Sequence, residues 1–599
     1  MCRVSGERTI ARLWRDAVAA QRDVPAYLEQ HGEEWRPVGW AEAAARVQDY
    51  ANGLLALGIR KGDAFALVAR TSVEWALLDF ALGSVGAIGV PIYPNSSAKE
   101  TGYILGHSEA LGVVVEDEEQ RAKVDEVRGE LPLLQHVLSF ADLDDLAARG
   151  RAHGKEHPHG LREAADAIGE DDLFTYIYTS GTTGPPKGCM ISHRNYYAMV
   201  AVVDHLERFT GAGDVMLLYL PLAHNFGRLM HLSGPYVGYT IAFLPDPLQA
   251  AAALPAVRPT VFPSVPRVYE KVHTAVVAKF DEETGVKRRL IDWALRVGAD
   301  VSRRRRAGEP VPARLAAQHR LADRLVYSKV KERLGGRLRT AISGGAPLSQ
   351  EIAEFFHSID ILLLEGYGLT ECTTAATTST HAAFKFGTVG KALPGVELRL
   401  AEDGELLIRS DTVFQGYLKD PAATAEVLTD DGWLLTGDIA EIDEEGFVKI
   451  TDRKKDLIVT AGGKNVAPQN LENELKSSKY ISQALVVGDR KPYVAAVVTL
   501  EPEELVKWAR SRGLEGDPED LSQRPEVHEL VQGIVDEVNA ERSRYEQIKR
   551  FAILPRDFSM ETGELTPTLK LKRRVVQQRY ADELEELYAG ATLNEAAAR

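Results

Sequence analysis

The sequence TSGTTGPPKG, at residues 179–188, has the residue types needed to hold a polyphosphate. It offers small hydroxyl groups, backbone N–H groups that glycine leaves unobstructed, and one fixed cation, Lys187. The Gly-x-x-x-x-Gly-Lys-Ser/Thr pattern of a P-loop cannot be laid on it in register. A plain surface loop is the alternative interpretation of such a cluster. The predicted phosphate-binding residues are Thr179, Ser180, Gly181, Thr182, Thr183, Gly184 and Lys187.

A second stretch, EGYGLTE at residues 365–371, follows a predicted buried strand at 361–364. Gly366 and Gly368 let the backbone approach a planar ligand, against which Tyr367 can stack or pack. Glu371 supplies a carboxylate, and Mg²⁺ prefers one or two carboxylates together with phosphates. This stretch therefore predicts a second wall of the same site.

Three weaker signals follow other predicted strands. The segment SGGAPLS, at 343–349, places a Gly-Gly turn after a strand. His224 follows a strand at 215–221, where ligands bind in α/β sheets, although a structural histidine is the alternative. Asp438 stands in Thr-Gly-Asp, a tight turn whose carboxylate can accept hydrogen bonds from two vicinal hydroxyls.

The elements that position these residues alternate along the chain. Strands are expected at 63–69, 87–92, 113–116 and 173–178, with helices at 40–57 and 72–85, which predicts a parallel sheet covered by helices. Smaller β structure is expected at 404–409 and 433–442. The last part reads as a compact α+β domain, and we place the domain boundary near residue 451.

Size and composition narrow the class of protein. At 599 residues the chain exceeds one ordinary core, so at least two domains are expected. The net charge of −16 argues against a general nucleic-acid binder. Cys2, Cys189 and Cys372 form no CxxC pair, so neither a zinc site nor a disulfide framework is predicted. No secretion signal or membrane-spanning stretch is recognised, which predicts a cytoplasmic protein.

The segment from about 270 to 340 differs in charge from the rest of the chain. Residues 279–339 hold 17 lysines and arginines against 8 aspartates and glutamates, with helical apolar spacing around the run 303–306. A solvated helical insertion is one interpretation. The other is a peripheral contact with anionic lipid, where each basic residue contributes about 1 kcal/mol.

Taken in order, the motifs TSGTTGPPKG, SGGAPLS, GYGLTE, TGD, DRKKDLIVTAGGKNVAPQNLE and TPTLKLKRR resemble those of the adenylate-forming superfamily. The resemblance covers nearly the whole chain and is most specific to long-chain fatty acyl-CoA synthetases, through PSVPRVYEK, the helical insertion and ILPRDFSMETGELTPTLKLKR. It implies an α/β fold with two domains. Residues 1–451 would form helix-covered sheets plus a β-barrel-like subdomain, and residues 452–599 a small mobile α+β domain.

The resemblance also implies a reaction. A fatty acid carboxylate attacks the α-phosphate of ATP, giving an acyl-adenylate and pyrophosphate, and the thiol of coenzyme A then displaces AMP. The catalytic residues would be Lys570, Lys187, Thr370 and Glu371, with Glu371 holding Mg²⁺. ATP and AMP would contact the loop at 179–187 together with Gly344, Gly345, Ala346, Gly366, Tyr367, Gly368, Thr370, Asp438 and Arg453. The acyl site would include His224 and Gly345.

The resemblance assigns further roles to the C-terminal part. Lys570 would reach the carboxylate and the α-phosphate from the small domain, with Lys572 as the alternative. Leu569 stands where the family pattern usually has glycine. The small domain would swing about Asp452 and bring Gly462, Gly463 and Lys464 to the thiol channel.

Three alternative functions remain, of which one is an enzyme of the same class and another is not an enzyme. A fatty acyl-AMP ligase would pass its adenylate to a carrier protein, although no fused carrier domain is recognised after residue 575. A catalytically dead relative would serve as a lipid-binding or scaffold protein, which the complete set of charged motif residues disfavours. Luciferase-like oxidation is a third possibility that no residue demands.

Overall fold

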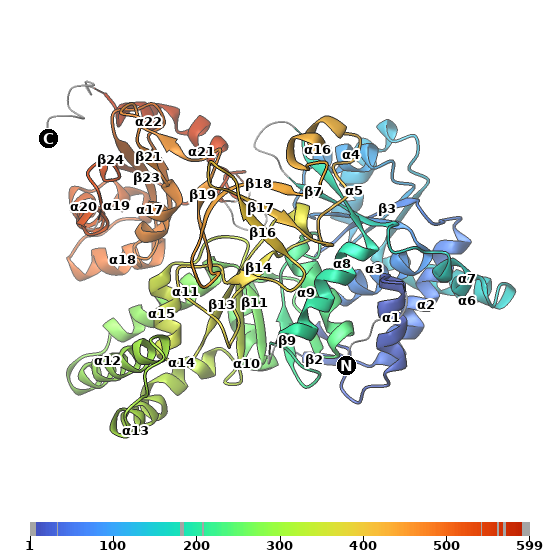
Figure 1. Ribbon diagram of the computed structural model, residues 1–599, viewed down its shortest axis with the longest axis horizontal. Helices are drawn as coiled ribbons and strands as arrows, with labels where there is room; N and C mark the ends of the chain where they lie inside the picture. The colour runs from blue at the N-terminus through green and yellow to red at the C-terminus, as the bar shows by residue number, and fades with distance from the viewer. Residues whose placement is uncertain are drawn as a thin grey trace.

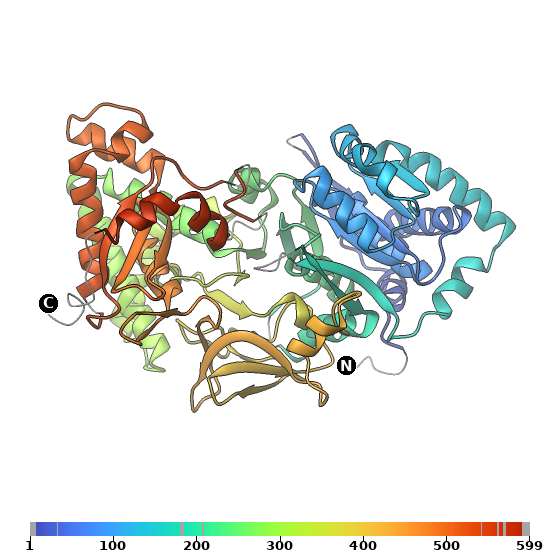
Figure 2. The ribbon, with the colours of Figure 1, turned by 90° about the horizontal axis from the view of Figure 1, so that it is seen from above.

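The computed structural model describes residues 7–32, 34–179, 185–206, 209–540, 542–559, 562–566 and 571–589. Figure 1 shows strands and helices of the N-terminal and middle parts in one large body, and a smaller unit of C-terminal elements at the upper left. Seen from above in Figure 2, the N-terminal part and this unit lie at opposite ends, and light-green helices from the middle of the chain lie behind this unit. The predicted fold class is confirmed: an α/β protein with a large N-terminal and a small C-terminal domain.

The first sheet consists of β3 (Ala64–Val68), β4 (Ile88–Ile92), β5 (Gly112–Val115), β6 (His136–Ser139), β7 (Leu173–Thr179) and β8 (Lys187–Ser192). Its order is β6-β5-β3-β4-β7-β8, and its neighbours are parallel except for the pair of β7 and β8. The parallel part agrees with the sequence prediction. Because β8 returns antiparallel to β7, the residues at both ends of the glycine-rich loop lie next to each other.

Seven helices of the described chain accompany this sheet: α1 (Ile10–Ala19), α2 (Trp40–Ala56), α3 (Val73–Val85), α4 (Ala98–His107), α5 (Glu118–Val127), α6 (Leu143–Glu156) and α7 (Gly160–Asp166). Helix α3 illustrates why the boundaries fall where they do. The Ser72 hydroxyl accepts a hydrogen bond from the Trp75 N–H at its start, and Gly86 ends it in the left-handed region at φ 74°.

The second sheet consists of β1 (Tyr27–His31), β2 (Glu34–Val38), β9 (Val215–Leu218), β10 (Thr240–Phe243), β11 (Val261–Ser264), β12 (Thr340–Gly344), β13 (Leu363–Tyr367), β14 (Thr377–Thr378) and β15 (Lys391–Ala392). Its order is β15-β14-β13-β12-β11-β9-β10-β1-β2. The strands from β10 to β13 and the β1–β10 pair are parallel, while both edges are antiparallel.

Strand β13 lies further along the chain than the sequence predicted. The strand expected at 361–364 begins at Leu363 and continues to Tyr367. The predicted strand ended at Leu364, before the charged Glu365 and Gly366. In the structure, the backbone of Glu365 pairs with Ser343 of β12, and Gly366 pairs with Gly344 of β12 and with β14. Pairing on both sides of the strand therefore overrides the weak strand propensity of these residues.

The third sheet is antiparallel and consists of β16 (Glu397–Leu400), β17 (Glu405–Arg409), β18 (Leu434–Ile442) and β19 (Val448–Arg453). Its register places Asp438 of β18 opposite Arg453 of β19. Two residues that belong to separate sequence motifs are thus direct neighbours in the sheet.

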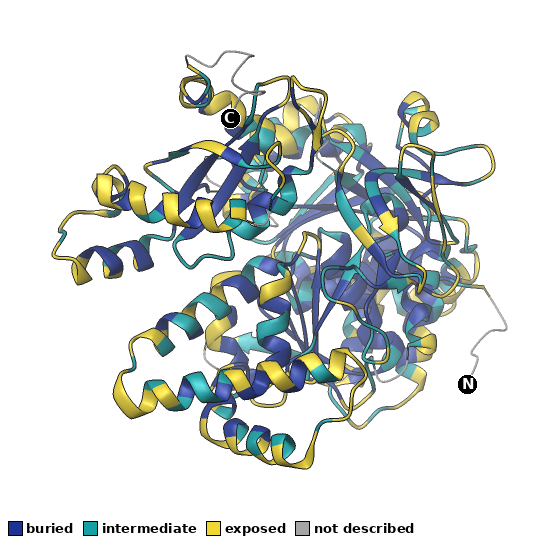
Figure 3. Cartoon of the chain, turned by 60° about the vertical axis from the view of Figure 1, so that its left-hand side comes forward, coloured by how far each residue is buried: buried dark blue, intermediate teal, exposed yellow. Residues whose placement is uncertain are grey.

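The middle of the chain holds α8 (His193–Ala201), α9 (Asn225–Val237), α10 (Ala250–Val257), α11 (Pro266–Asp281), α12 (Gly285–Arg306), α13 (Ala313–Ala322), α14 (Ser328–Arg333), α15 (Gln350–Ser358) and α16 (Pro421–Val427). The predicted helical insertion corresponds to α11 to α14, and Figure 3 shows α12 and α13 with long exposed faces. Among the described helices, none has the length and apolar character required to cross a bilayer.

The C-terminal unit contains β20 (Ile458–Val459), β21 (Asn465–Val466), β22 (Ile481–Val487), β23 (Val494–Leu500) and β24 (Ile548–Ile553), with α17 (Pro468–Leu475), α18 (Pro502–Ser511), α19 (Pro518–Ser522), α20 (Pro525–Ala540), α21 (Arg573–Arg579) and α22 (Ala581–Glu586). Two clusters of buried apolar side chains pack on the sheet β22-β23-β24, and all their members follow residue 457. The exact boundary at 451/452 stays a prediction.

A fully buried polar cluster joins four elements of the N-terminal domain. The Arg228 guanidinium of α9 bonds to Asp79 of α3, and its Nη1 donates to Thr175 Oγ1 of β7 at 2.6 Å. The Thr175 hydroxyl in turn donates to the Gly89 carbonyl of β4 at 2.6 Å. Burial disfavours the charged form of Asp79, but Arg228 and His231 outweigh that effect and hold the pKa of the carboxyl below its ordinary value.

We expect Arg228→Met to lower the free energy of unfolding by about 3–5 kcal/mol, because it leaves the Asp79 carboxylate buried without its guanidinium partner. The double variant Asp79→Leu/Arg228→Met should lose less than either single change, since no charge stays buried. Arg36→Met is the matched control, because this arginine pairs with Glu29 at an exposed site, where such pairs contribute below about 1 kcal/mol. Denaturant unfolding followed by fluorescence measures these three variants, the single variant Asp79→Leu and the wild type. Equal losses for Arg228→Met and Arg36→Met would contradict the assignment.

Candidate active site

The ends of β7 and β8 carry the described part of the predicted phosphate loop. Thr179 at the end of β7 pairs with Lys187 at the start of β8. The Lys187 ammonium lies 5.0 Å from the centre of the Tyr417 ring and 4.0 Å from the Asp420 carboxylate. The predicted phosphate ligands Ser180, Gly181, Thr182, Thr183 and Gly184 lie outside the described residues.

Glu371 lies in a short 3₁₀ turn, Thr370–Cys372, that follows β13. Tyr417 Oη donates a hydrogen bond to Glu371 Oε1 at 2.7 Å, and the Phe414 N–H donates to the Glu371 carbonyl at 2.9 Å. Thr374 has a φ of 115°, a strained value for a β-branched residue. The neighbouring structure holds this strain, so the position of the carboxylate is set by tertiary contacts.

The structure explains why the second glycine of the EGYGLTE stretch, Gly368, is needed. A Cβ at this position would stand 2.0 Å from the Thr374 carbonyl oxygen, so only glycine lets the chain just after β13 pass so close to the strained turn. The glycine is required by packing of the protein against itself, in addition to any approach of a ligand.

Tyr367, Asp438 and Arg453 meet at another wall. Tyr367 Oη donates to Asp438 Oδ2 at 2.5 Å, and Arg453 Nε lies 3.4 Å from Asp438 Oδ1. The carboxylate is buried, with only 5% of the residue exposed. The three side chains form a polar cluster next to the Gly366 backbone, as the sequence motifs suggested.

A continuous cavity of about 3280 Å³ joins these walls. It includes most of the predicted site residues: Thr179, Lys187, His224, Gly344, Gly345, Ala346, Gly366, Tyr367, Gly368, Thr370, Glu371, Asp438 and Arg453. Residues from the first, second and third sheets therefore face one space.

His224 lines the same cavity as a group of apolar side chains. It is the N-cap of α9, and its Nδ1 accepts a hydrogen bond from the Phe226 N–H at 3.2 Å. Apolar side chains of α8, the turn that follows it, α9 and β9 line the cavity as well: Met199, Val202, Leu206, Met216, Phe226, Leu229 and Met230. A long apolar substrate fits this lining.

Four predicted residues do not line the described cavity. Asp452 is buried in β19, where its Oδ1 accepts from the Arg453 N–H at 2.6 Å and burial raises its pKa to about 6. Gly462, Gly463 and Lys464 are exposed on the turn between β20 and β21. In this arrangement of the domains, the turn does not reach the site.

The predicted catalytic lysine, Lys570, lies outside the described residues. Thr566 and Leu571, which flank the undescribed segment, line the cavity, and so does the alternative residue Lys572. The assignment of Lys570 over Lys572 stays a prediction.

Three functional candidates escaped the sequence analysis. Tyr417 contacts both Lys187 and Glu371, although its own motif, Gly-Tyr-Leu-Lys-Asp, carries no obvious chemistry. Asn225 accepts from Tyr196 Oη at 2.5 Å and donates to the Thr370 carbonyl at 3.3 Å. Glu365 lines the cavity as a buried carboxyl group whose pKa burial raises to about 8. Of these three residues, only Glu365 could have been predicted from the sequence, because it carries a charge beside the glycines of the EGYGLTE stretch.

Comparison with known families places the chain. The family described as "AMP-binding enzyme" matches residues 14–418, and "AMP-binding enzyme C-terminal domain" matches residues 455–592. The chain therefore belongs to the AMP-binding enzyme family. The resemblance to the adenylate-forming superfamily is confirmed.

Individual relatives share most of the chain. It is 40% identical over 579 residues to the long-chain-fatty-acid–CoA ligase FadD15 of Mycobacterium bovis, covering 95% of both proteins. It is 32% identical over 625 residues to the long-chain-fatty-acid–CoA ligase ACSBG2 of Xenopus laevis, covering 97% of this chain and 84% of that protein. The crystal structure of the adenylation domain of a carboxylate reductase from Mycobacterium chelonae matches with a TM-score of 0.75 and 26% identity, over 97% of this chain and 91% of that one.

We expect Glu365→Gln to raise the thermal unfolding midpoint relative to the wild type by roughly 5 °C at pH 8 and by little at pH 4.5. Burial raises the folded pKa of Glu365 above its unfolded value of about 4.5 to about 8. The stability that its proton contributes is thus complete below pH 4.5 and lost as the pH rises through 8, whereas glutamine stays neutral. Glu351→Gln, at an exposed position, is the control. A difference that is independent of pH would show that Glu365 does not titrate as described.

Proposed function

We propose that this protein is a long-chain-fatty-acid–CoA ligase that forms AMP. A fatty acid carboxylate oxygen bonds to the α-phosphorus of ATP, and the α–β phosphoanhydride bond breaks to release pyrophosphate. The sulfur of coenzyme A then bonds to the acyl carbon, its thiol proton leaves, and the acyl–oxygen bond to AMP breaks. The products are acyl-CoA, AMP and pyrophosphate.

The observation that carries this proposal is the single cavity in which a charged half and an apolar half meet. Lys187 and Glu371 line the charged half, whereas Phe226, Leu229 and Met230 line the apolar half. An acid with a long alkyl chain can place its carboxylate beside a nucleotide phosphate only where two such halves are joined. The names of the relatives support the same substrate class.

The proposed residue roles follow from charge and position. Lys187 and the loop of residues 179–184 would neutralise the β- and γ-phosphates, with Thr370 near the α-phosphate. The backbone at Gly344, Gly345, Ala346, Gly366 and Gly368 would bound the adenine beside Tyr367. Asp438, with Arg453 beside it, would accept hydrogen bonds from the ribose hydroxyls. Lys570 would bring a further cation to the oxygens that gain charge.

The donor set fits a magnesium ion. The described residues contain no group of three or more histidine, cysteine, aspartate and glutamate side chains that could cage a metal. One carboxylate, Glu371, together with nucleotide phosphates is the usual environment of Mg²⁺. The ion would neutralise phosphate charge there, while Glu371 holds it.

Domain alternation would supply the second step. In the present arrangement, ion pairs join the domains between Lys479 and Asp281 at 2.6 Å and between Arg267 and Glu501 at 3.2 Å. The turn at Gly462, Gly463 and Lys464 lies away from the cavity. We propose that the domain of residues 452–599 rotates about Asp452 and brings this turn to the thiol channel.

We also propose a peripheral contact with anionic membranes, through α13 and not through the arginine run of α12. All four arginines of that run form ion pairs: Arg303 with Asp300, Arg304 with Glu309, Arg305 with Asp360 and Arg306 with Glu354. On and after α13, exposed Leu321 and Leu325 stand beside exposed Arg314, Arg320 and Arg324. For these three arginines, no described carboxylate lies within 4.0 Å.

The ligase proposal predicts thioester formation only when ATP, Mg²⁺, fatty acid and coenzyme A are all present. Lys570→Ala should slow adenylate formation at least about 100-fold, because a cation at the reacting oxygens is lost. Lys572→Ala is the matched control and should retain the rate. AMP and acyl products are measured by chromatography over a series of saturated acids of increasing length. Acyl-adenylate that accumulates without thioester would instead identify an acyl-AMP ligase, which loads a carrier protein. An inactive chain that still binds fatty acid would identify a lipid-binding relative.

The membrane proposal predicts that Arg314→Gln/Arg320→Gln/Arg324→Gln weakens binding to anionic phosphatidylglycerol vesicles by at least about tenfold, at roughly 1 kcal/mol per arginine. Arg128→Gln/Arg149→Gln/Arg162→Gln removes the same charge from other exposed positions and should change binding little. Vesicle co-sedimentation measures both variants. Equal binding by the two triple variants would refute the role of α13.

A further inference from the structure

Segment 414–418 lies in the chain between β17 of the third sheet and α16. It runs along β8 as an additional short strand. The Leu418 N–H donates to the Gly188 carbonyl at 2.8 Å, and the Met190 N–H donates to the Gly416 carbonyl at 2.9 Å. A bridge between Cys189 and Tyr417 completes this antiparallel pairing. The backbone of Tyr417 is therefore fixed relative to the strand that begins with Lys187.

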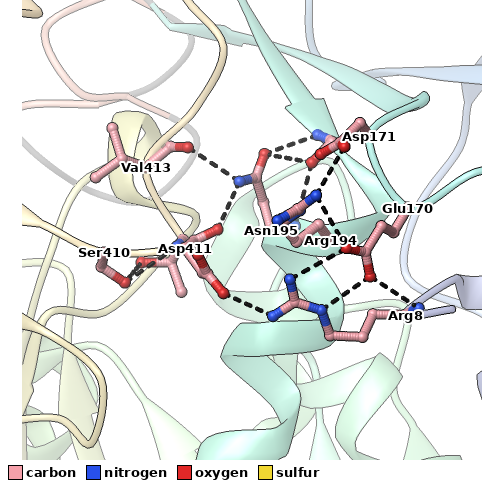
Figure 4. A network of polar contacts seen from close by, with 10 residues as sticks. Arg8, Glu170, Asp171, Arg194, Asn195, Ser410, Asp411 and Val413 are labelled. Atoms are coloured by element: carbon pink, nitrogen blue, oxygen red, sulfur yellow. Dashed lines mark hydrogen bonds and ion pairs between the residues drawn. The ribbon is translucent and has the colours of Figure 1, made fainter. Parts of the chain in front are cut away.

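Polar contacts fix the preceding residues as well, as Figure 4 shows. Asn195 Nδ2 of α8 donates to the carbonyls of Asp411 and Val413 at 2.8 and 2.9 Å. Arg8 Nη1 donates to the Asp411 carboxylate at 2.6 Å and its Nε donates to Glu170 at 3.0 Å. These contacts tie residues 411 and 413, just before the segment, to α8 and to Arg8, which also bonds to Glu170 shortly before β7.

The geometry of the segment also depends on Gly416. Its φ of 123° lies in the left-handed range, and a Cβ there would stand 2.7 Å from Thr424 Cγ2. The Thr424 hydroxyl oxygen accepts from the Tyr417 N–H at 2.9 Å. The turn is thus built so that Tyr417 faces the site in one orientation.

The Tyr417 side chain contacts both charged groups of the phosphate site. Its hydroxyl donates to Glu371 Oε1 at 2.7 Å, while its ring lies 5.0 Å from the Lys187 ammonium. Among the described residues, no hydrogen bond reaches Glu371 Oε2, and no ion pair joins Lys187 to Glu371. One carboxylate oxygen is held and the other is left for a ligand.

This arrangement solves an electrostatic problem. A lysine and a glutamate that face the same cavity attract each other, and an ion pair between them would occupy both groups. A phenol satisfies each of them with weaker contacts, a hydrogen bond to the carboxylate and a cation–π contact to the ammonium. The two charges then stay apart, with the Lys187 ammonium 5.0 Å from the centre of the phenol ring and 4.0 Å from the Asp420 carboxylate.

We propose that Tyr417 is a positioning residue of the phosphate site, which orients Glu371 for a divalent cation through its hydroxyl and holds Lys187 through its ring. The inference rests on the proposed function, because it takes Glu371 as the metal ligand and Lys187 as the phosphate ligand. It adds that two parts of one side chain have different roles. The Tyr417 hydroxyl orients the metal ligand, and the Tyr417 ring positions the phosphate ligand.

Calorimetric binding of ATP to the full-length protein tests this division, without fatty acid or coenzyme A. Tyr417→Phe keeps the ring and removes the hydroxyl, so the affinity for Mg²⁺-ATP should fall about tenfold while that for ATP in EDTA stays unchanged. Tyr417→Leu also removes the ring, so both affinities should fall. A Tyr417→Phe variant that binds Mg²⁺-ATP like the wild type, or that loses both affinities equally, overturns the proposal.

Tyr236→Phe is the matched control, because this phenol is also buried and donates to a carboxylate, Asp204 Oδ2, at 2.6 Å, but neither residue lines the cavity. It should leave both affinities unchanged. Glu371→Gln distinguishes failure of the proposed metal site from failure of the proposed role of Tyr417. If it leaves the Mg²⁺-ATP affinity unchanged, the proposed metal site fails. If it lowers that affinity and Tyr417→Phe does not, only the role of Tyr417 fails.

A double variant guards against a general effect on folding. In the Glu371→Gln background, Tyr417→Phe should cause no further loss of Mg²⁺-ATP affinity, because its hydroxyl acts only through the carboxylate. A second tenfold loss in that background would show that the tyrosine acts by another route. Thermal unfolding midpoints of all variants are measured in parallel.

Discussion

The pairing of segment 414–418 with β8 is the contact on which the candidate site depends. It joins the connection between β17 and β18 of the third sheet to the first sheet, through the backbone hydrogen bonds at Gly188 and Met190. The Phe414 N–H extends the same connection to the Glu371 carbonyl, next to the end of the second sheet. Without this pairing, Lys187 and Glu371 would belong to separate layers. With it, one strand edge brings their opposite charges to a common cavity.

Buried polar contacts give the neighbouring elements the same fixed relation. Arg228 joins α9 to α3 and β7, so the helix that begins beside His224 is held against the strand that leads to the phosphate loop. Asn225 extends this connection to the Thr370 carbonyl. Each group loses its hydration on burial, and only a complete set of partners makes that loss tolerable. The same requirement makes the geometry of the site specific.

The relation between the domains is looser. Beyond residue 457 the C-terminal unit has its own apolar core, and exposed or half-exposed ion pairs such as Lys479–Asp281 connect it to α11. Such pairs contribute little free energy. The position of Gly462, Gly463 and Lys464 away from the cavity is therefore compatible with a second orientation, in which the same turn serves the thiol step of the proposed reaction.

Sequence alone determined the class of the fold and the family, and most of the site residues that it predicted line the cavity. Short motifs rich in glycine, hydroxyl groups and charge have a binding chemistry that depends on their own residues. Hydrophobic periodicity predicts the strands at whose ends these motifs lie. It did not determine the end of β13, where Glu365 continues the strand, because pairing with β12 and β14 outweighs local propensity. Nor did it identify Tyr417, Asn225 or the ion pairs that neutralise the arginine run of α12. Those depend on contacts between residues far apart in the chain, which only the packed tertiary structure brings within hydrogen-bonding distance.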